Sequence, residues 1–288
     1  MLDGQVVIVT GASAGIGEAT ARMLAGKGAT VVITARRADR LEKLKQQIEA
    51  VGGRAHAVAG DITSDVDRKR LVEEVVTSFG RIDALVNNAG YGQRGPIELV
   101  SVESIRQNFE TNLFSLIALT QLVIPIMRRQ KRGRIVNISS VAGKIARPLS
   151  SVYDATKHAL EAISDGLRGE LATFGIKVVI IEPGFIITEF LGVANEGARE
   201  FTESDNPYKS FFEGFGAGYQ RMRKMAGKPD DIALLVLKAL TAANPRARYA
   251  APRHAKLAIA LKRWLPSALF EGILNRQAGV PGKMRDES

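Results

Sequence analysis

Short apolar runs separated by longer amphipathic segments extend through the first two thirds of the chain. The strand-like runs lie at residues 5–10, 30–35, 54–61, 83–90, 133–140 and 176–183. Runs of this length are typical of strands buried on both faces, as in a parallel sheet. Helix-like segments fill the gaps, notably residues 16–28, 101–130 and 151–174. This alternation predicts one α/β domain, with helices on both faces of a parallel sheet.

The pattern changes after Pro183, where residues 188–226 carry many aromatic side chains without a clear period. These are Phe190, Phe201, Tyr208, Phe211, Phe212, Phe215 and Tyr219. The segment follows the carboxyl end of a strand, where open α/β sheets bind their ligands, so we predict that it forms a substrate lid. Ordinary packing of a pair of surface helices is the alternative.

Composition excludes several kinds of site. The 288 residues suit one large α/β domain and contain no cysteine, so disulfides and thiolate metal sites are excluded. His56, His158 and His254 are scattered along the chain, and we predict no metal site. There is no signal peptide pattern and no apolar run of 18 residues, so we expect a cytoplasmic protein.

The net charge of +10 is concentrated near the C-terminus. Between Ile232 and Phe270 there is no Asp or Glu. The same stretch holds Lys238, Arg246, Arg248, Arg253, Lys256, Lys262 and Arg263. Such a patch is either a solvated basic face or a surface for phosphates, nucleic acid or anionic lipid. No nucleic-acid-binding module is recognisable and no aromatic residues interleave with the patch, so we expect no nucleic-acid partner.

Residues 252–288 are predicted to form a basic amphipathic helical extension after a catalytic domain at 1–251. Its apolar positions fall on one helical face before Pro266 and resume after it: Leu257, Leu261, Trp264, Leu265, Leu269, Phe270, Ile273 and Leu274. The shortness of this stripe favours packing onto the chain's own domain. A basic helix with a tryptophan can also lie on an anionic bilayer, and peripheral membrane contact is our hypothesis.

The stretch TGASAGIG, residues 10–17, joins the first strand to the first helix. Gly11 allows a tight turn, while Gly15 and Gly17 let the backbone approach a ligand closely. The helix N-terminus then offers unpaired N–H groups to a pyrophosphate. The spacing is Gly-x-x-x-Gly-x-Gly and differs from the Gly-x-Gly-x-x-Gly fingerprint. Its place between a buried strand and a helix nevertheless predicts dinucleotide binding.

The end of the second strand indicates which dinucleotide binds. NAD-dependent enzymes usually place a carboxylate there for the ribose 2′-hydroxyl. Here the strand ends at Ala35, and Arg36 and Arg37 follow. Two guanidinium groups without a carboxylate suit a 2′-phosphate, so we predict NADP(H). The alternative is that both are exposed arginines at a helix entry.

The stretch VYDATKHAL, residues 152–160, places Tyr153 and Lys157 four positions apart on a predicted helix. Both side chains can therefore project from one face. A free tyrosine has a pKa of about 10, and we expect the nearby cation to lower it toward neutrality. Tyr153 then suits proton transfer. Ser140 ends the preceding strand and could hold a substrate oxygen, and Asn112 could bridge a water to Lys157.

Six motifs occur together in one order: TGASAGIG, NNAG, Asn112 in FETNLFS, ISS ending at Ser140, YDATK and PGFIIT. To about residue 250 the chain resembles the short-chain dehydrogenase/reductase family in these motifs and their spacing. The resemblance implies a single-domain, Rossmann-type, doubly wound parallel sheet of about seven strands in three α/β/α layers. It also implies an enzyme that interconverts a carbonyl and an alcohol with NADP(H). A catalytically idle NADP(H)-binding sensor on the same fold is the alternative.

The resemblance carries roles over by position. It implies that Gly11, Ser13, Gly15, Ile16 and Gly17 hold the pyrophosphate, Arg36 and Arg37 the 2′-phosphate, Asp61 and Ile62 the adenine, Asn88, Ala89 and Gly90 the adenosine ribose, and Pro183, Gly184 and Thr188 the nicotinamide carboxamide. It makes Tyr153 the acid/base, with Ser140 at the substrate oxygen. Lys157 would bind the nicotinamide ribose, and Asn112 would anchor the proton relay.

The substrate is expected to be lipophilic, of steroid, retinoid or long-chain type. Ile145, Leu149 and Phe185 are expected near the cleft beside the aromatic lid. In its C-terminal third the chain weakly resembles retinol and 17β-hydroxysteroid dehydrogenases, through the lid and RARYAAPRHAKLAIALKRWLPSALF. The family commonly assembles through its two long central helices, so the resemblance also implies a homodimer or homotetramer.

Overall fold

Seven parallel strands form one sheet in the computed structural model of the chain, in the order β3-β2-β1-β4-β5-β6-β7. The structure describes residues 1–190, 192, 198–203, 206–209, 211–212, 225–278 and 280. The strands are β1 (Val6–Thr10), β2 (Thr30–Ala35), β3 (Arg54–Ala59), β4 (Ala84–Asn87), β5 (Gly133–Ile138), β6 (Ile176–Pro183) and β7 (Arg248–Ala251). The predicted doubly wound parallel sheet is confirmed. Its seventh strand, β7, is too short to be located from an apolar run.

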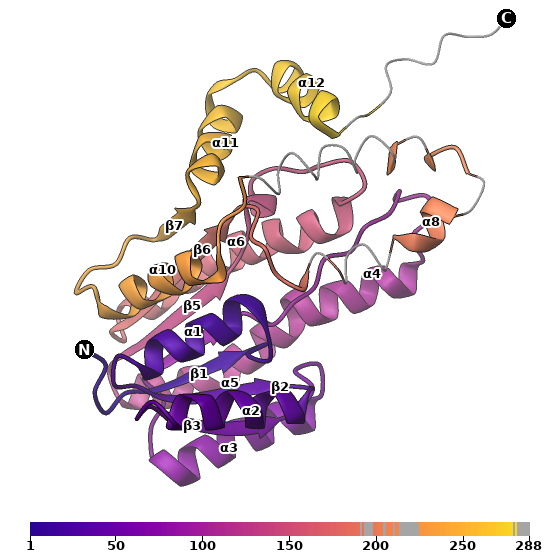
Figure 1. The fold of residues 1–288 in the computed structure, drawn as a ribbon. Coiled ribbons are helices and arrows are strands. Elements are labelled where there is room, and N and C mark those ends of the chain that lie inside the picture. The colour runs from indigo at the N-terminus through magenta and orange to yellow at the C-terminus, as the bar shows by residue number, and fades with distance from the viewer. Residues whose placement is uncertain are drawn as a thin grey trace, which may run out of the picture.

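Helices cover both faces of the sheet, as Figure 1 shows. The α-helices that lie within the described residues are α1 (Gly15–Ala25), α2 (Ala38–Glu49), α3 (Asp65–Phe79), α4 (Val102–Phe109), α5 (Ser115–Arg129), α6 (Ser151–Ala172), α8 (Arg199–Glu203), α10 (Pro229–Thr241), α11 (Arg253–Trp264) and α12 (Ser267–Ala278). Two short turns of other helix types are η1 (Glu110–Phe114) and η2 (Val141–Gly143).

Alternate residues of each strand point to opposite faces, and each face has its own core. In β1, Val7 and Val9 pack in a cluster with residues of α1, α2 and α10. Val6 and Ile8 pack on the other face with residues of α3 and α5. The continuous apolar runs seen in the sequence arise because both faces of each central strand are covered.

The helix predicted over residues 101–130 is present but is not regular. α4 and α5 are joined by η1, one turn of π-helix. The whole span Val102–Arg129 is long and apolar enough to cross a membrane by length and composition alone. Its apolar side chains, among them Val123 and Met127, instead pack with α3 against the sheet.

The strand order reverses between β1 and β4, which are neighbours in the sheet but distant in sequence. At such a switch point the loops after the two strands diverge and leave a crevice at the carboxyl edge. The turn after β1 begins at Gly11, and the loop after β4 begins at Asn88. The fold therefore brings the two predicted cofactor motifs to one edge.

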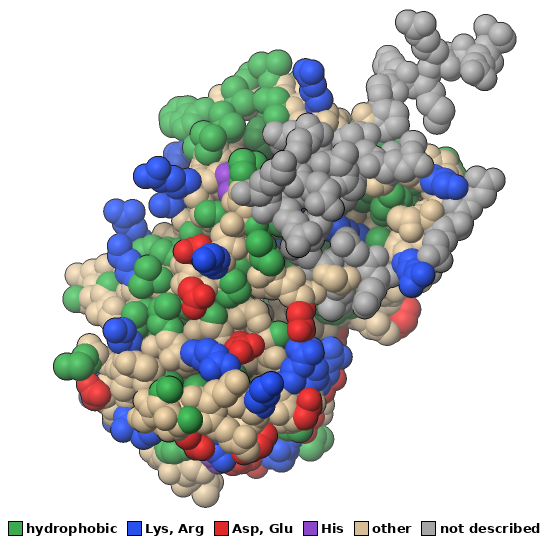
Figure 2. Space-filling model, viewed as in Figure 1, with side chains coloured by type: hydrophobic (Ala, Val, Ile, Leu, Met, Phe, Trp, Pro, Cys, Tyr) green, Lys and Arg blue, Asp and Glu red, His purple; other side chains and the backbone are tan. Residues whose placement is uncertain are grey.

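The C-terminal helices α11 and α12 project away from the sheet (Figure 1). In α11 only Ala255 is buried, whereas Leu257 and Trp264 are 61% and 78% exposed. In α12, Phe270 is buried but Leu269 is exposed. Hydrophobic side chains gather over this helix pair, with Lys and Arg beside them (Figure 2). The expectation that the stripe packs onto its own domain is therefore wrong for these exposed residues, because α11 meets the domain mainly through its first turn.

Candidate active site

The glycine turn after β1 has the shape that an anion site requires. Gly11 and Gly15 have φ angles of +63° and +58°, which favour glycine. A Cβ on Gly17 would lie 2.3 Å from the Gly11 carbonyl oxygen. The cap residue of α1, Ala14, makes no side-chain hydrogen bond, so N–H groups of the first turn remain available. Ser13 and Ile16 lie in the same turn, which fits a pyrophosphate.

The NNAG motif after β4 is fastened to this turn. The Asn88 amide donates to the carbonyl oxygens of Thr10 and Gly11, at 2.9 and 3.2 Å. The Thr10 hydroxyl accepts from the backbone N–H groups of Asn88 and Ala89, both at 2.9 Å. Asn88 therefore braces the crevice with its side chain, and sequence reasoning missed the role of Thr10. A Cβ on Gly90 would lie 2.8 Å from the Asn112 Oδ1 atom, so this position also needs glycine.

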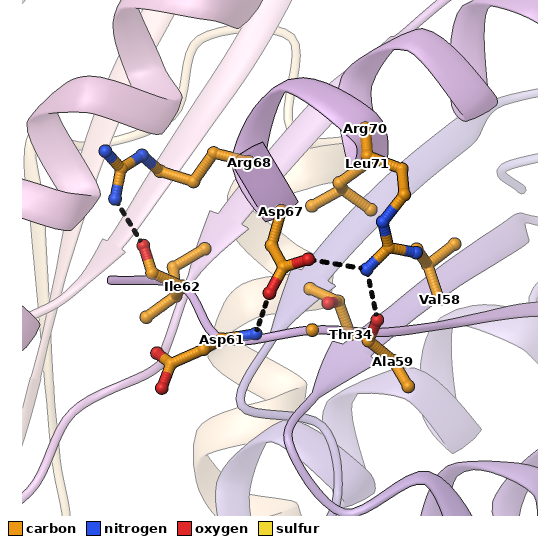
Figure 3. A pocket seen from close by; sticks show the side chains of 10 residues that line it. Thr34, Val58, Ala59, Asp61, Ile62, Asp67, Arg68, Arg70 and Leu71 are labelled. Atoms are coloured by element: carbon orange, nitrogen blue, oxygen red, sulfur yellow. Dashed lines mark hydrogen bonds and ion pairs between the residues drawn. The ribbon is translucent and has the colours of Figure 1, made fainter. Parts of the chain in front are cut away.

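A small pocket lies at the carboxyl ends of β2 and β3 (Figure 3). Its lining comprises Thr34, Val58, Ala59, Gly60, Asp61, Ile62, Asp67, Arg68, Arg70 and Leu71. Arg70 donates to the Ala59 carbonyl oxygen and to Asp67, while Asp67 accepts from the backbone of Asp61. These contacts fix the wall on which the predicted adenine residues Asp61 and Ile62 lie.

The arginines after β2 differ in their partners. Arg36 is exposed and forms no ion pair with the described part of the chain. Arg37 and Arg40 both pair with Glu189, at 2.9 and 2.6 Å. Arg37 also donates to the Ser13 hydroxyl in the glycine turn. The structure thus places Arg37 against the glycine turn, and Glu189 is a neighbour that sequence reasoning missed. The binding of a 2′-phosphate by Arg36 and Arg37 stays a prediction.

Tyr153 and Lys157 lie near the start of α6, as predicted, and both are buried. The Lys157 Nζ atom lies 5.8 Å from the centroid of the Tyr153 ring and donates to the Ile138 carbonyl oxygen at 2.9 Å. Burial raises the pKa of Tyr153 to about 12 and lowers the pKa of Lys157 to about 8. The expectation that Lys157 lowers the pKa of Tyr153 is wrong for the chain alone, because desolvation dominates and the effects that oppose it come from Ser140 and Arg147.

Ser140 lies beside Tyr153 at the end of β5. Its hydroxyl accepts from the Ala142 N–H at 3.1 Å and donates to the Pro183 carbonyl oxygen at 3.4 Å. A hydrogen bond with Ser140 opposes the burial effect on the pKa of Tyr153. The loop between them is held by Arg147, which donates from its backbone and side chain to the buried Asp154.

Asn112 lies in the π-helical turn η1 and is fully buried. Its carboxamide accepts from the Tyr91 N–H and donates to the Tyr91 carbonyl oxygen, both at 2.9 Å. It also donates to Asn108 and to Thr156 of α6. π-turns occur mostly at functional sites, and this one joins α4, α6 and the NNAG loop. The side chain of Asn112 therefore ties these elements together, and its role in bridging a water to Lys157 stays a prediction.

The described part of the predicted lid packs beside the catalytic helix. Phe201 is buried in a cluster with Val100 and Val152, and it stacks on Phe212 with ring centroids 6.3 Å apart. The Tyr208 hydroxyl donates to Glu98 at 2.6 Å, and the Tyr208 and Phe211 rings lie 5.6 Å apart. Phe215 and Tyr219 lie outside the described residues.

The segment after β6, predicted to hold the nicotinamide, lies against the glycine turn and the start of α11. The Gly184 N–H donates to the Ala251 carbonyl oxygen at 2.7 Å, and a Cβ on Gly184 would lie 2.8 Å from His254. Thr188 lies across the glycine turn, with its Cγ2 atom 3.0 Å from the position of a Cβ on Gly15. Ile145 and Leu149 are buried, so they stand behind the cleft surface, and Leu149 has a φ of 59°. Such strain in a leucine is uncommon and concentrates at functional sites.

A buried charge cluster lies behind Lys157. Glu161, one turn further along α6, accepts from Lys144 at 2.7 Å and from Arg248 at 2.9 Å. Glu182 of β6 lies 3.9 and 3.6 Å from the same two cations. Within the described structure, one carboxylate oxygen each of Glu161 and Glu182 has no hydrogen-bond partner, nor has the Ser139 hydroxyl. Burial, and then repulsion from Glu161, raises the pKa of Glu182 to about 7.

This cluster makes stability depend on pH. Below pH 4.5 Glu182 is protonated in both the folded and the unfolded chain. Between pH 4.5 and about 7 only the folded chain keeps the proton, so raising the pH destabilises the fold. Glu182→Gln removes this cost, and we expect it to raise stability at pH 8 by about 1–2 kcal/mol, with the gain vanishing near pH 4.5.

Thermal unfolding of both proteins from pH 4.5 to 8 measures the effect. The exposed Glu49→Gln variant serves as the control and should match the wild type at each pH. A difference in melting temperature between Glu182→Gln and the wild type that stays constant with pH would contradict this assignment.

The chain is similar in sequence and structure to known short-chain dehydrogenases and reductases. Residues 5–199 match the family described as short chain dehydrogenase. The chain is 31% identical to a 3-ketodihydrosphingosine reductase of Bacteroides thetaiotaomicron, over 93% of this chain and 95% of that protein. It is 35% identical to an NADPH-dependent 3-dehydrocapnine reductase of Ornithobacterium rhinotracheale, over 84% and 86% of the two chains. A metagenomic short-chain oxidoreductase solved in complex with NADP superposes with a TM-score of 0.70 at 31% identity, covering 87% of this chain and 97% of that one.

Proposed function

The chain belongs to the short-chain dehydrogenase family and is an oxidoreductase of that kind, and we propose that it reduces a lipophilic ketone or aldehyde with NADPH. The observation that carries this proposal is the grouping of Ser140, Tyr153 and Lys157 at the carboxyl edge of the sheet. Phe190 contacts Tyr153 of this group and Glu189 pairs with Arg37, so residues 189 and 190 connect the group to the predicted 2′-phosphate site. A dinucleotide lying between the two would bring its nicotinamide to Ser140 and Tyr153, where a carbonyl can receive a hydride and a proton.

The chain's residues supply orientation and the proton. NADPH, when bound, provides the hydride that reaches the carbonyl carbon. The Ser140 hydroxyl donates a hydrogen bond to the carbonyl oxygen and holds it beside Tyr153. Because the pKa of Tyr153 is raised to about 12, its hydroxyl is protonated at neutral pH and serves as the general acid. Lys157, with a pKa of about 8, is mainly cationic at pH 7 and stabilises the phenolate that forms.

The proposed cofactor preference rests on the end of β2. Ala35 offers no carboxylate to a ribose hydroxyl, and Arg36 has its guanidinium free of ion pairs within the described residues. A guanidinium binds phosphate through two parallel hydrogen bonds. The NADP complex of the metagenomic neighbour and the NADPH-dependent relative support the same choice.

The proposed substrate is a lipophilic carbonyl compound, with a long-chain ketone foremost. The two relatives named as reductases of 3-ketodihydrosphingosine and 3-dehydrocapnine support this class. The buried aromatic cluster around Phe201, which adjoins α6 through Val152, offers an apolar wall beside the catalytic helix.

A panel assay tests the function. NADPH oxidation is followed with 3-ketodihydrosphingosine, steroid ketones, retinal, long-chain aldehydes and small diketones, and is repeated with NADH. We expect turnover of a long-chain or other bulky lipophilic carbonyl, with NADPH preferred. Turnover of the small diketones alone would overturn the substrate class. Tight NADPH binding without turnover of any compound would favour the catalytically idle sensor.

The proposed assembly is a homodimer or homotetramer formed through α5 and α6. Exposed apolar side chains lie along this region: Phe114 in η1, Ile163 in α6 and Phe174 just after it. Solvent-exposed aromatic rings of this kind commonly mark protein interfaces.

The proposed location is the cytoplasmic face of a membrane, reached through α11 and α12. Leu257, Trp264 and Leu269 are exposed, and Lys256, Lys262 and Arg263 lie on the same helices. An exposed apolar face flanked by cations fits an anionic bilayer. Such a contact would give the crevice access to a lipid-dissolved substrate.

Trp264 provides a direct readout because it is the only tryptophan in the chain. We expect the protein to sediment with vesicles containing phosphatidylserine at low salt, with a blue shift of the tryptophan emission. Leu257→Ser should weaken binding about five- to tenfold, because an exposed leucine loses its contact with the bilayer. The Val51→Ser variant, with an exposed valine after α2, should bind like the wild type. No sedimentation of the wild type would refute the membrane contact.

A further inference from the structure

Residues 186–190, which we call the strap, cross the carboxyl edge of the sheet. The strap is anchored by Ile186, which is buried and pairs with Gly227 in an isolated bridge. The next side chains contact different parts of the cofactor crevice. Thr188 lies on the glycine turn at Gly15. Phe190 meets Tyr153 edge to face, with ring centroids 5.5 Å apart.

Glu189, between these two residues, fastens the strap to the nucleotide end. Its two carboxylate oxygens accept from Arg37 at 2.9 Å and from Arg40 at 2.6 Å. These arginines precede it by 152 and 149 positions, so the contacts are formed by the fold and not by local structure. Arg37 also donates to Ser13 at 2.9 Å, which extends the chain of contacts to the glycine turn.

The partners of Glu189 are, beside Arg36, cations suited to a 2′-phosphate. They follow the strand end that has no carboxylate of its own, and both guanidiniums direct N–H groups at an anion. A carboxylate offers two oxygens and one charge, whereas a phosphate offers three oxygens and nearly two charges. Glu189 therefore resembles the phosphate in chemistry but binds the arginines less strongly.

We propose that Glu189 stands in for the 2′-phosphate in the cofactor-free enzyme, and that the phosphate must displace it from Arg37 and Arg40 in order to bind. This inference rests on the proposed NADP(H) function. Displacement frees the strap at its nucleotide end, and the strap carries the Phe190 ring that covers Tyr153. Cofactor binding is thereby coupled to access to the catalytic tyrosine, and NADH, which has no 2′-phosphate, leaves the contact in place.

The coupling between Glu189 and the phosphate predicts the direction in which a mutation of Glu189 changes the affinity for phosphate-bearing ligands. If phosphate binding releases Glu189, then release of Glu189 must strengthen phosphate binding by the same factor. Glu189→Gln keeps the shape of the side chain and removes its charge. We expect it to lower the Kd for phosphate-bearing ligands about three- to tenfold, a modest factor because both ion pairs are exposed.

Two simple probes isolate the phosphate. Isothermal titration of the full chain with 2′,5′-ADP and with 5′-AMP compares ligands that share adenosine and the 5′-phosphate and differ only in the 2′-phosphate. Glu189→Gln should tighten binding of 2′,5′-ADP and of NADPH, and leave 5′-AMP and NADH unchanged. Glu18→Gln is the matched control, since Glu18 also pairs with an arginine, Arg22, on an exposed helix surface. Thermal melting confirms that both variants are folded.

The outcomes separate this inference from the proposed function. Unchanged or weaker binding of 2′,5′-ADP by Glu189→Gln, in a wild type that prefers 2′,5′-ADP to 5′-AMP, overturns the role of Glu189 alone. Weaker binding would mean that Glu189 orients Arg37 for the phosphate and does not compete with it. A wild type that prefers 5′-AMP overturns the proposed NADP(H) preference, and the role of Glu189 with it.

Discussion

Tyr153→Phe is expected to lower kcat for carbonyl reduction by about 10²- to 10⁴-fold, the range that a positioned general acid contributes. The variant keeps the buried ring and its contact with Phe190 but loses the hydroxyl beside Ser140. Steady-state NADPH oxidation with the best carbonyl of the panel measures the loss.

The cofactor affinity of the same variant provides the control. The hydroxyl of Tyr153 touches the substrate end of the crevice, so the Kd for NADPH should change by less than about threefold. A variant that retains more than about a tenth of the wild-type kcat would show that the proton comes from another group. Loss of NADPH binding would point instead to a collapsed site.

Arg36→Ser is expected to raise the Kd for NADPH about 10- to 100-fold and to leave the Kd for NADH unchanged. The reason is that a hydrogen-bonded charge pair contributes about 1.5–3 kcal/mol, and Arg36 is the arginine at the end of β2 without an ion pair in the described region. Titration of the wild type and of Arg36→Ser with NADPH and with NADH measures the effect.

Lys43→Ser provides the matched comparison for Arg36→Ser. Lys43 is an exposed cation on α2, six residues after Arg37 in the predicted phosphate site. The Lys43→Ser variant should bind NADPH like the wild type if a specific contact with Arg36, and not the overall positive charge of this region, attracts the phosphate. An equal loss in Arg36→Ser and Lys43→Ser, or an equal effect on NADH, would contradict a specific contact.

The parts of this site that could be predicted from sequence are those set by local spacing. Tyr153 and Lys157 share a helix face because they are four residues apart, and Gly11 and Gly15 lie in a turn because a buried strand precedes them. The strands β2 and β6 begin and end at the predicted residues, because each is a short apolar run and its ends are marked by the polar residues around it.

The parts that could not be predicted are contacts between distant segments and the effect of burial. Nothing in the local pattern links Glu189 to Arg37, or Arg248 to Glu161, because an ion pair leaves no period in either segment. The π-turn around Asn112 interrupts a helix whose apolar spacing looks regular. The pKa of Tyr153 rises because the folded chain removes water from the ring, which the spacing of Tyr153 and Lys157 does not reveal.

The packing of α1 against α10 has a consequence for synthesis of the chain. Ala21 and Leu24 of α1 lie in the same core as Ile232 and Val236 of α10, roughly 200 residues later. While the ribosome adds these residues, the apolar face of α1 has no final partner, and at 5–20 residues per second this lasts roughly 10–40 seconds. The nucleotide-binding half of the sheet can pair its strands early, yet it remains open to aggregation until α10 emerges. A nascent chain stalled before residue 229 should therefore be a preferred client of chaperones.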